Sequence, residues 1–167
     1  MFADAARPLG CAEIQDSRSV AIADLDNDGR LDMVVANNAD PPTIHMNRIR
    51  SAGNYLRVVL TGARDKNRDA IGGRVRVTIE HNEQRRTLSR WVEVGSGYCS
   101  QSDTRLHFGL GQAEKVTALE VTWPDGQKQT FQEEALQDIV NRELRIQQGV
   151  DRLERSSATV LNTARKE

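Results

Sequence analysis

Four aspartates within residues 24–32 have the residue types and the spacing of a metal site. Ca²⁺ is a hard cation that takes about six to eight oxygen ligands, and alternate residues of a tight loop can supply most of them. A bound cation would also neutralise four negative charges that otherwise repel one another. The candidate calcium ligands are Asp24, Asp26, Asp28 and Asp32.

The residues after the third aspartate shape this loop. Gly29 allows a sharp turn, since glycine takes positive φ without steric cost, and such a turn would aim the carbonyl of Arg30 inward as a further ligand. An EF-hand would need a bidentate Glu at its twelfth position, where this chain has Val35. The flanks 19–23 and 31–36 are short, apolar and partly β-branched, which favours a calcium site in a β-hairpin. The alternative is a polar Asp/Asn/Gly turn without metal.

Composition is that of an ordinary folded domain. The chain has 167 residues, 38% apolar and 28% charged, with a net charge of −1, so overall charge gives no argument for nucleic acid or a membrane. The charge is uneven: residues 1–50 carry five basic and eight acidic side chains (net −3), and residues 57–90 carry nine and four (net +5). The sequence shows no transmembrane-length apolar run and no signal peptide, and Met1 could begin a segment of a longer protein.

The cysteines and histidines are scattered. Cys11 and Cys99 could pair in an oxidising compartment, but we expect free, buried thiols. No spacing of Cys and His suggests zinc. His107 lies in a predicted strand, where a structural histidine with satisfied hydrogen bonds is the default expectation.

The first fifty residues predict three strands, near 19–24, 31–37 and 43–47. Pro41 and Pro42 end the second strand, because proline lacks an N–H and fixes φ. Residues 51–54 resemble a connector, and composition shifts there from acidic to basic. We therefore place a domain boundary between residues 1–50 and a second region, 54–149.

Residues 54–149 predict about seven short strands and turns, typical of an antiparallel sandwich or barrel-like domain. In 73–79, Val75, Val77 and Ile79 alternate with polar residues and should face the core. Residues 124–126, Pro-Asp-Gly, form a hairpin turn. The predicted strands are 55–60, 73–79, 86–94, 106–108, 116–123, 127–131 and 144–146.

Residues 150–167 show a different pattern. Val150, Leu153, Val160, Leu161 and Ala164 lie near one helical face among charged residues. We therefore expect a short C-terminal helix or a flexible tail. The expected fold is mainly β: a single propeller-type hairpin with a calcium loop, then a β-sandwich-like domain, then this tail.

Two sets of motifs resemble known families. Residues 20–38 resemble an FG-GAP/VCBS repeat, a blade of the β-propellers found in integrin α-like proteins. A second set is similar to an ASPIC/UnbV domain, the C-terminal module of cartilage acidic protein 1-like proteins. That set comprises 54–58, 67–75, 95–103, 106–111 and 121–126.

The resemblance implies that Asp24, Asp26, Asp28 and Asp32 bind calcium together with the Arg30 carbonyl. It supplies no catalytic residues. Family members usually carry several propeller repeats before the ASPIC/UnbV module, whereas this chain has room for one. A single blade generally needs neighbouring blades to pack against for stability. The chain is therefore the C-terminal part of a longer propeller protein, or the blade packs on the second domain, or a partner supplies the missing blades.

Three functions follow as hypotheses. The first is a calcium-stabilised, non-catalytic binding, adhesion or assembly module, extracytoplasmic (periplasmic, cell-surface or secreted), with a protein partner or a carbohydrate or matrix ligand. The second is RNA binding through a basic face of residues 57–90, although few aromatic rings accompany it. The basic residues concerned are Arg57, Arg64, Lys66, Arg68, Arg74, Arg76, Arg85, Arg86 and Arg90.

The third hypothesis is an enzyme, suggested by Ser96, Ser100, Ser102, Asp103 and His107. A catalytic triad is defined by geometry in space, however, and the chain has no Gly-x-Ser-x-Gly elbow. We expect no enzymatic activity and interpret residues 95–98 as a tight loop that the fold requires.

Overall fold

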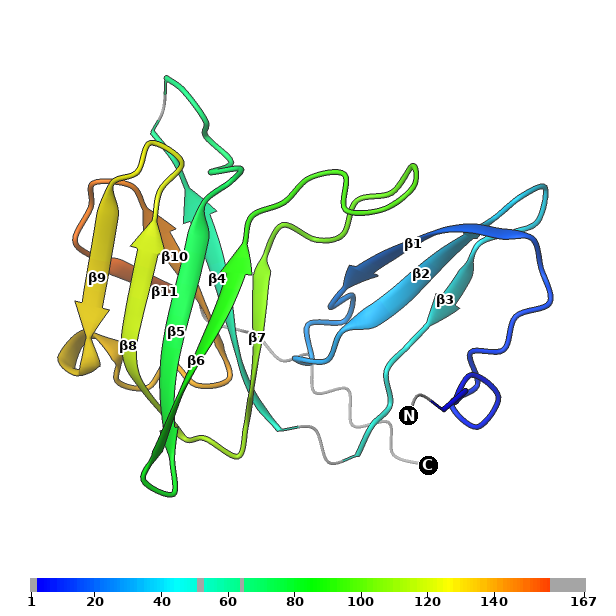
Figure 1. The fold of residues 1–167 in the computed structure, drawn as a ribbon, viewed down its shortest axis with the longest axis horizontal. Coiled ribbons are helices and arrows are strands. Elements are labelled where there is room, and N and C mark those ends of the chain that lie inside the picture. The colour runs from blue at the N-terminus through cyan, green and yellow to red at the C-terminus, as the bar shows by residue number, and fades with distance from the viewer. Residues whose placement is uncertain (1–2, 51–52, 64, 157–167) are drawn as a thin grey trace.

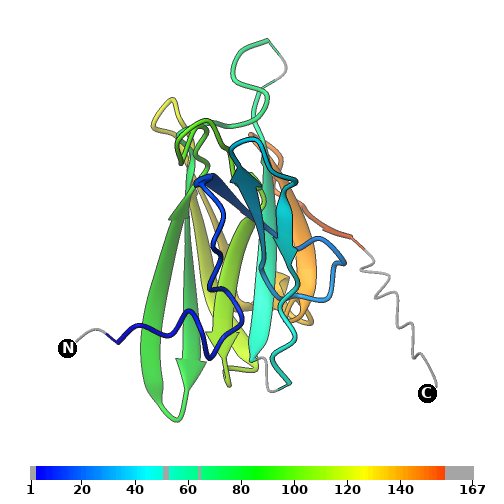
Figure 2. The same ribbon diagram turned by 90° about the vertical axis from the view of Figure 1, so that its right-hand side faces the viewer.

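The computed structural model describes residues 3–50, 53–63 and 65–156, and this part of the chain is almost entirely β. A small three-stranded sheet stands beside a larger two-layered β-sandwich (Figure 1). Viewed from its own side, the small sheet lies in front of the sandwich (Figure 2). The expected mainly β fold is confirmed.

The small sheet, here called the hairpin sheet, contains β1 (Ser17–Ala23), β2 (Asp32–Asn37) and β3 (Thr43–His45) in the antiparallel order β1-β2-β3. The aspartate-rich loop joins β1 to β2, as the sequence predicts. All three predicted strands are present, and the third is shorter than expected. That the sheet is a propeller blade stays a prediction.

The sandwich consists of two four-stranded sheets. The facing sheet, on the side of the hairpin sheet, has the order β11-β10-β4-β7, and the outer sheet has the order β6-β5-β8-β9. Between β9 and β10 the chain forms the 3-10 helical turn η1 (Glu133–Leu136). The strands are β4 (Asn54–Thr61), β5 (Arg74–His81), β6 (Gln84–Trp91), β7 (Leu106–Gly111), β8 (Lys115–Thr122), β9 (Lys128–Gln132), β10 (Arg142–Gln147) and β11 (Leu153–Ser156).

Alternating side chains build the core between these two sheets. On β5, Val75, Val77 and Ile79 are buried, whereas Arg74 and Arg76 point the other way, as predicted. The facing sheet contributes an equivalent apolar row. Its fully buried members include Leu56, Val58, Phe108, Leu144 and Ile146.

The expectation of an all-antiparallel domain is wrong for one strand pair. Strand β10 pairs with β4 in parallel, with Leu144 opposite Val58. After η1 the chain passes from the outer sheet to the facing sheet and enters it beside β4 rather than beside its sequence neighbour β9. Apolar alternation reports which face of a strand is buried and carries no information on its direction.

The predicted C-terminal helix is also wrong where the structure describes it. Residues 153–156 form β11, and Leu153 pairs with Ile146. Gly149, at φ 76°, turns the chain back so that β11 supplies backbone partners to the edge of β10. Residues 157–167, with Val160, Leu161 and Ala164, lie outside the described residues.

The two thiols are free but not buried, which corrects half of that expectation. Cys99 is exposed at a positive φ of 48° in a loop, and Cys11 is half-buried in the N-terminal segment. Both cysteines lie outside the sandwich core, in segments that few other residues shield from solvent. Among the described residues, no helix has the length and apolarity that crossing a membrane requires.

Replacing Leu153 with Ser tests the strand β11. This side chain packs against the core while half-buried, so we expect the free energy of unfolding to fall by about 1–2 kcal/mol, less than for a fully buried leucine. Val150→Ser is the matched control, since Val150 is 40% exposed and would share a helical face with Leu153. Urea unfolding measures both variants, and equal losses would contradict the strand.

Candidate metal centre and its docking on the sandwich

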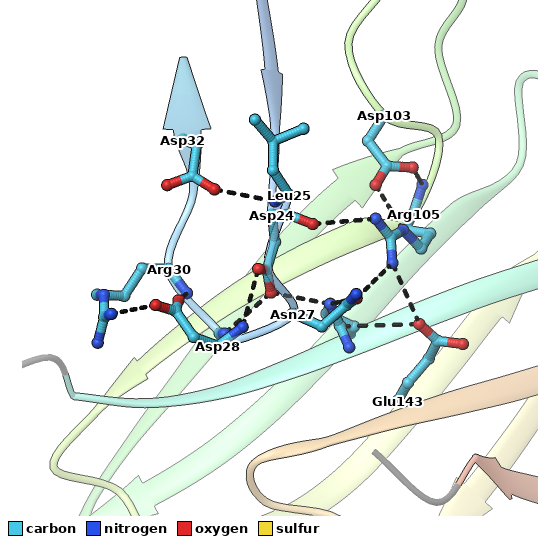
Figure 3. Close-up of polar contacts among 11 residues, drawn as sticks. Asp24, Leu25, Asn27, Asp28, Arg30, Asp32, Asp103, Arg105 and Glu143 are labelled. Atoms are coloured by element: carbon cyan, nitrogen blue, oxygen red, sulfur yellow. Dashed lines mark hydrogen bonds and ion pairs between the residues drawn. The ribbon is translucent and has the colours of Figure 1, made fainter. Parts of the chain in front are cut away.

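The loop between β1 and β2 is organised by the carboxylate of Asp24. One of its oxygens accepts the amide of Asp28 at 3.0 Å, and the other accepts the amide of Gly29 at 2.9 Å (Figure 3). Asp24 is 2% exposed. The aspartate thus closes the loop upon itself in the manner of an extended Asx turn.

Three of the four predicted acidic ligands come together. One carboxylate oxygen from each of Asp24, Asp26 and Asp28 lies within 4.8 Å of the others, which is compatible with shared ligation of one Ca²⁺. Asp32 is not a member of this group. Its two oxygens accept the backbone amides of Leu25 at 2.9 Å and Asn47 at 2.8 Å, so this side chain fastens the base of the loop.

Arg30 contributes its side chain to the loop. The guanidinium pairs with the Asp28 carboxylate and donates to the carbonyl of Asn47 at 2.7 Å. The Arg30 amide donates to Asp28 at 2.8 Å. These contacts partly neutralise Asp28, and ligation by the Arg30 carbonyl stays a prediction.

The charge in the loop is incompletely balanced. Burial raises the pKa of Asp28, and the charges of Asp26 and Asp24 raise it further, against the lowering effect of the amide and guanidinium of Arg30. The ionised form of Asp28 is therefore disfavoured in the folded loop, a cost that a cation would relieve. On donor chemistry and spacing, Asp24, Asp26 and Asp28 fit a calcium ion.

The tip of the loop rests on an aromatic ring of the facing sheet. Gly29 is buried at φ 87°, and a Cβ at this position would overlap the ring of Tyr55 on β4. Glycine is therefore required twice, for the left-handed backbone and for the close approach. The sequence indicated the first reason, and the second depends on a residue that lies far along the chain.

A buried ion pair fixes the loop to the sandwich. Arg57 of β4 donates from Nη1 to the Asp24 carboxylate at 2.8 Å, and the two side chains are 5% and 1% exposed. The same nitrogen donates to Asn27 at 3.0 Å. Glu143 of β10 lies 3.7 Å from Arg57 Nε and adds a second negative charge. The sequence predicts Arg57 as part of a basic surface; its burial makes it an internal counter-ion instead.

Arg105 completes the charged junction shown in Figure 3. It donates to the Asp24 carbonyl at 3.3 Å and to the Asn27 side chain at 3.1 Å. It also pairs with Asp103 and approaches Glu143 at 3.8 Å. No sequence motif indicated a role for Arg105. Its role depends on contacts between segments far apart in the chain, which a local sequence pattern does not report.

Residues 96–103 bind the free edge of β1. The Ser100 hydroxyl donates to the Val20 carbonyl at 2.9 Å, and the Ile22 amide donates to the Ser102 hydroxyl at 3.2 Å. The Asp103 amide donates to the Ile22 carbonyl at 2.9 Å. This segment contains a tight turn between Gly97 and Ser100, and it also serves as a strap between the sandwich and the hairpin sheet.

His107 differs from its expectation. Its ring stacks on Tyr55 with centroids 5.7 Å apart, and its buried Nδ1 has no hydrogen-bond partner among the described residues. Burial lowers its pKa. The predicted hydrogen-bond satisfaction is therefore wrong, because the ring packs on an aromatic face rather than beside an acceptor. No hydrogen bond links His107 to a serine among the described residues.

A match to a protein-family model identifies the family to which this chain belongs. The family described as ASPIC and UnbV matches residues 63–152, more than half of the chain. The chain belongs to the ASPIC/UnbV family. The matched residues include the sandwich strands β5 to β10. Strand β4, which carries both Tyr55 and Arg57, lies wholly before the matched range, and β11 lies after it.

Known relatives are much longer. Cartilage acidic protein 1 of Xenopus tropicalis is 30% identical over 122 residues, which cover 70% of this chain and 18% of that protein. The mouse and human proteins of the same name are each 31% identical over 108 residues, 63% of this chain and 16% and 15% of theirs. The chain thus spans less than a fifth of the length of these relatives.

The described basic residues of 57–90 do not all lie on one face. Arg57 is internal, and Arg74 and Arg76 lie on the outer sheet, where Glu120 is 3.7 Å from Arg76. Arg85 pairs with Glu80 at 3.0 Å. Arg64 is outside the described residues. The predicted basic face therefore lacks Arg57, and acidic partners accompany Arg76 and Arg85, which counts against RNA binding.

Arg57→Met tests whether the junction depends on the buried ion pair. Because Met leaves the Asp24 carboxylate buried without its cation, we expect the free energy of unfolding in chelator to fall by about 3–5 kcal/mol. Arg76→Met is the matched control, since its pair with Glu120 is exposed and contributes about 0–1 kcal/mol. Chemical denaturation measures both, and similar losses would refute the special role of Arg57.

His107→Phe tests the buried imidazole through pH. A pKa lowered on folding means that stability from the neutral ring is fully present above about 6.5, the unfolded value, and is lost as pH falls through the folded pKa. The variant keeps an aromatic ring on Tyr55 and removes this titration. Melting midpoints between pH 5 and 8 should therefore fall less steeply than for the wild type. Parallel curves would contradict the assignment, and exposed His81→Gln is the control.

Proposed function

We propose that this chain is a calcium-stabilised, non-catalytic binding or assembly module of an extracytoplasmic protein. The supporting observation is that Asp24, Asp26 and Asp28 converge in a loop which the buried Arg57–Asp24 pair fixes to the ASPIC/UnbV domain. Calcium, when bound, would supply charge neutralisation and a rigid point of attachment. Asp32 and the Arg30 carbonyl stay candidates for additional ligation.

Several features support calcium as the cation. The donors are hard oxygens, and the loop is already ordered by amide hydrogen bonds to Asp24. The nearby guanidiniums of Arg57 and Arg30 weaken the attraction for a cation, so a low affinity is expected. Extracellular calcium modules bind at about 10⁻⁴–10⁻³ M, which suits a site exposed to millimolar calcium outside the cell. This match supports the extracytoplasmic location.

An assembly role is supported by exposed apolar side chains on both faces of the hairpin sheet and in the segment before it. Ile14, Val20 and Ile44 are 97%, 43% and 57% exposed. A three-stranded sheet of this size is expected to bury such residues against neighbours. The chain spans less than a fifth of its relatives, so the neighbours would be further propeller blades of a longer protein or a protein partner. A carbohydrate or matrix ligand, with an adhesive role, is a further part of this proposal.

The absence of catalysis is supported by the contacts of the serines and the aspartate that were candidates for a catalytic triad. Ser100 and Ser102 serve as backbone partners of β1, and Asp103 pairs with Arg105. These groups are engaged in holding the strap in place. Each function assigned to these three residues is structural.

Calcium addition is the direct test. At about 10 mM Ca²⁺ and a dissociation constant of about 10⁻⁴–10⁻³ M, mass action stabilises the fold by about 1.4–2.7 kcal/mol. The melting midpoint should then rise by about 3–10 °C relative to EDTA. Asp26→Asn should abolish most of this rise, whereas exposed Asp40→Asn should retain it. An unchanged wild-type midpoint would refute the proposal.

Asp28→Asn is a second test of calcium binding, in which the variant should not be destabilised in EDTA but should lose the stabilisation by calcium. Because the pKa of Asp28 is raised in the fold, its ionised form costs stability as pH rises through that pKa. In EDTA at pH 7 the variant should therefore melt at or above the wild-type midpoint, and in Ca²⁺ it should lose the stabilisation by calcium.

Terbium luminescence tests where the ion binds. Tyr55 lies beside Gly29 and should sensitise a terbium ion bound in the loop, so Tyr55→Phe should reduce emission more than Tyr98→Phe.

A further inference from the structure

Strand β6 forms an open edge of the outer sheet. It pairs with β5 on one side only, and its eight residues make it the longest strand at a sheet edge in the described part of the chain. At its turn the β5–β6 hairpin extends past the other strands of the sandwich (Figure 1). The edge of a sheet presents unpaired backbone groups that another extended chain can bind. Strand β6 therefore offers the longest run of such groups.

The turn of this hairpin determines which backbone groups of β6 are open. Its two residues both have positive φ, and the residues that flank them pair directly. In such a hairpin the flanking pair exchanges both hydrogen bonds, and so does every second pair beyond it. The residues between these pairs, Arg85, Thr87 and Ser89, therefore direct their N–H and C=O groups away from β5. Among the described residues no backbone group of another segment binds them, and the Ser89 carbonyl accepts the guanidinium of Arg90 at 3.0 Å.

The side chains of β6 differ between its two faces. On the outward face Arg85 pairs with Glu80 at 3.0 Å, so its charge is balanced. On the other face Arg86 and Arg90 are exposed, and neither has an ion pair within the described part of the chain. Leu88 lies between them, half-buried against the core. This face thus presents a positive, an apolar and a second positive side chain at every second residue.

This order of side chains defines the strand that would fit beside β6. Residues directly opposite each other in adjacent strands have Cβ atoms about 4.5–5.5 Å apart, so opposite charges stabilise the pair and like charges destabilise it. Acidic residues opposite Arg86 and Arg90, with an apolar residue opposite Leu88, give the pattern acidic-x-apolar-x-acidic. A second copy of β6 would bring arginines together. A nucleic acid would offer phosphates to the arginines but no backbone that alternates donors and acceptors along the edge.

We propose that β6 binds an extended acidic segment of a partner protein by strand addition, with Arg86 and Arg90 selecting acidic residues four positions apart. Backbone hydrogen bonds would supply the affinity, and the side-chain pairs would supply the choice of sequence. This contact belongs to the sandwich rather than to the hairpin sheet, and it does not depend on bound calcium. It therefore adds a second contact surface to the module proposed above.

A designed peptide tests strand addition on the full chain. The probe is acetyl-Thr-Glu-Thr-Val-Thr-Glu-Thr-amide, which is palindromic and so fits a parallel or an antiparallel strand. The matched control peptide, acetyl-Thr-Thr-Glu-Val-Glu-Thr-Thr-amide, has the same composition but carries its acids on the other face. We expect a dissociation constant of about 0.1 mM for the probe and about fivefold weaker binding of the control, measured from amide chemical shifts in NMR. The probe should also slow hydrogen exchange of the Arg85, Thr87 and Ser89 amides.

Three variants separate the side-chain and backbone contributions. Arg86→Gln combined with Arg90→Gln should weaken binding of the probe about fivefold, because two exposed ion pairs are lost. Arg76→Gln is the matched control, since Arg76 lies on the outward face of β5 beside Glu120, and it should bind like the wild type. Thr87→Pro removes an N–H that points away from β5, so the domain should still melt cooperatively while binding of the probe is lost.

Several results would overturn the proposal. They are absence of binding, equal binding of the two peptides, or unchanged binding by folded Thr87→Pro. Protection of the edge amides that rises with protein concentration in the free chain would assign the edge to a second copy instead. Tighter binding of oligouridylate than of the probe, lost when Arg86 and Arg90 are replaced, would assign it to RNA. Melts in Ca²⁺ and EDTA measure the calcium response separately from all of these outcomes.

Discussion

The buried contact between Arg57 and Asp24 is the interaction on which the arrangement of the two β parts depends. Asp24 orders its own loop through two backbone amides, and the same carboxylate receives the guanidinium from β4. Removing two charges from water is favourable only when each is well paired and hydrogen-bonded. Asn27 and Glu143 supply that additional pairing. The local shape of the loop and its position on the sandwich are therefore one electrostatic arrangement.

This arrangement also bears on the calcium binding that we propose for the acidic loop. The guanidiniums of Arg57 and Arg30 compensate for part of the negative charge, while burial and, to a smaller extent, the charges of Asp26 and Asp24 raise the pKa of Asp28. Full compensation would leave a cation nothing to neutralise, and no compensation would prevent burial of Asp24. The loop lies between these limits, which is consistent with a weak, stabilising calcium site.

Much of the fold could be predicted from local pattern. The alternation in β5 gave its core face correctly, and turn residues located most strand ends. The predictions failed where pairing between distant segments decides the outcome. Leu153 has a spacing compatible with a helix, yet β11 forms because the edge of β10 offers unpaired backbone groups. The direction of β10 and the stacking of His107 on Tyr55 were likewise invisible to a local pattern.

The sequence by itself determined the identity of the acidic loop, the β character of both parts and the motifs of the ASPIC/UnbV domain, because these depend on residues close together in the chain. Only the tertiary structure decided that Asp32 fastens the loop base while three other aspartates converge, and that Arg57, Tyr55 and Arg105 receive the loop. Burial and charge pairing depend on what lies opposite a side chain in space. For Asp24 that partner is 33 residues away, and for Asn27 and Arg105 the separation is 78 residues.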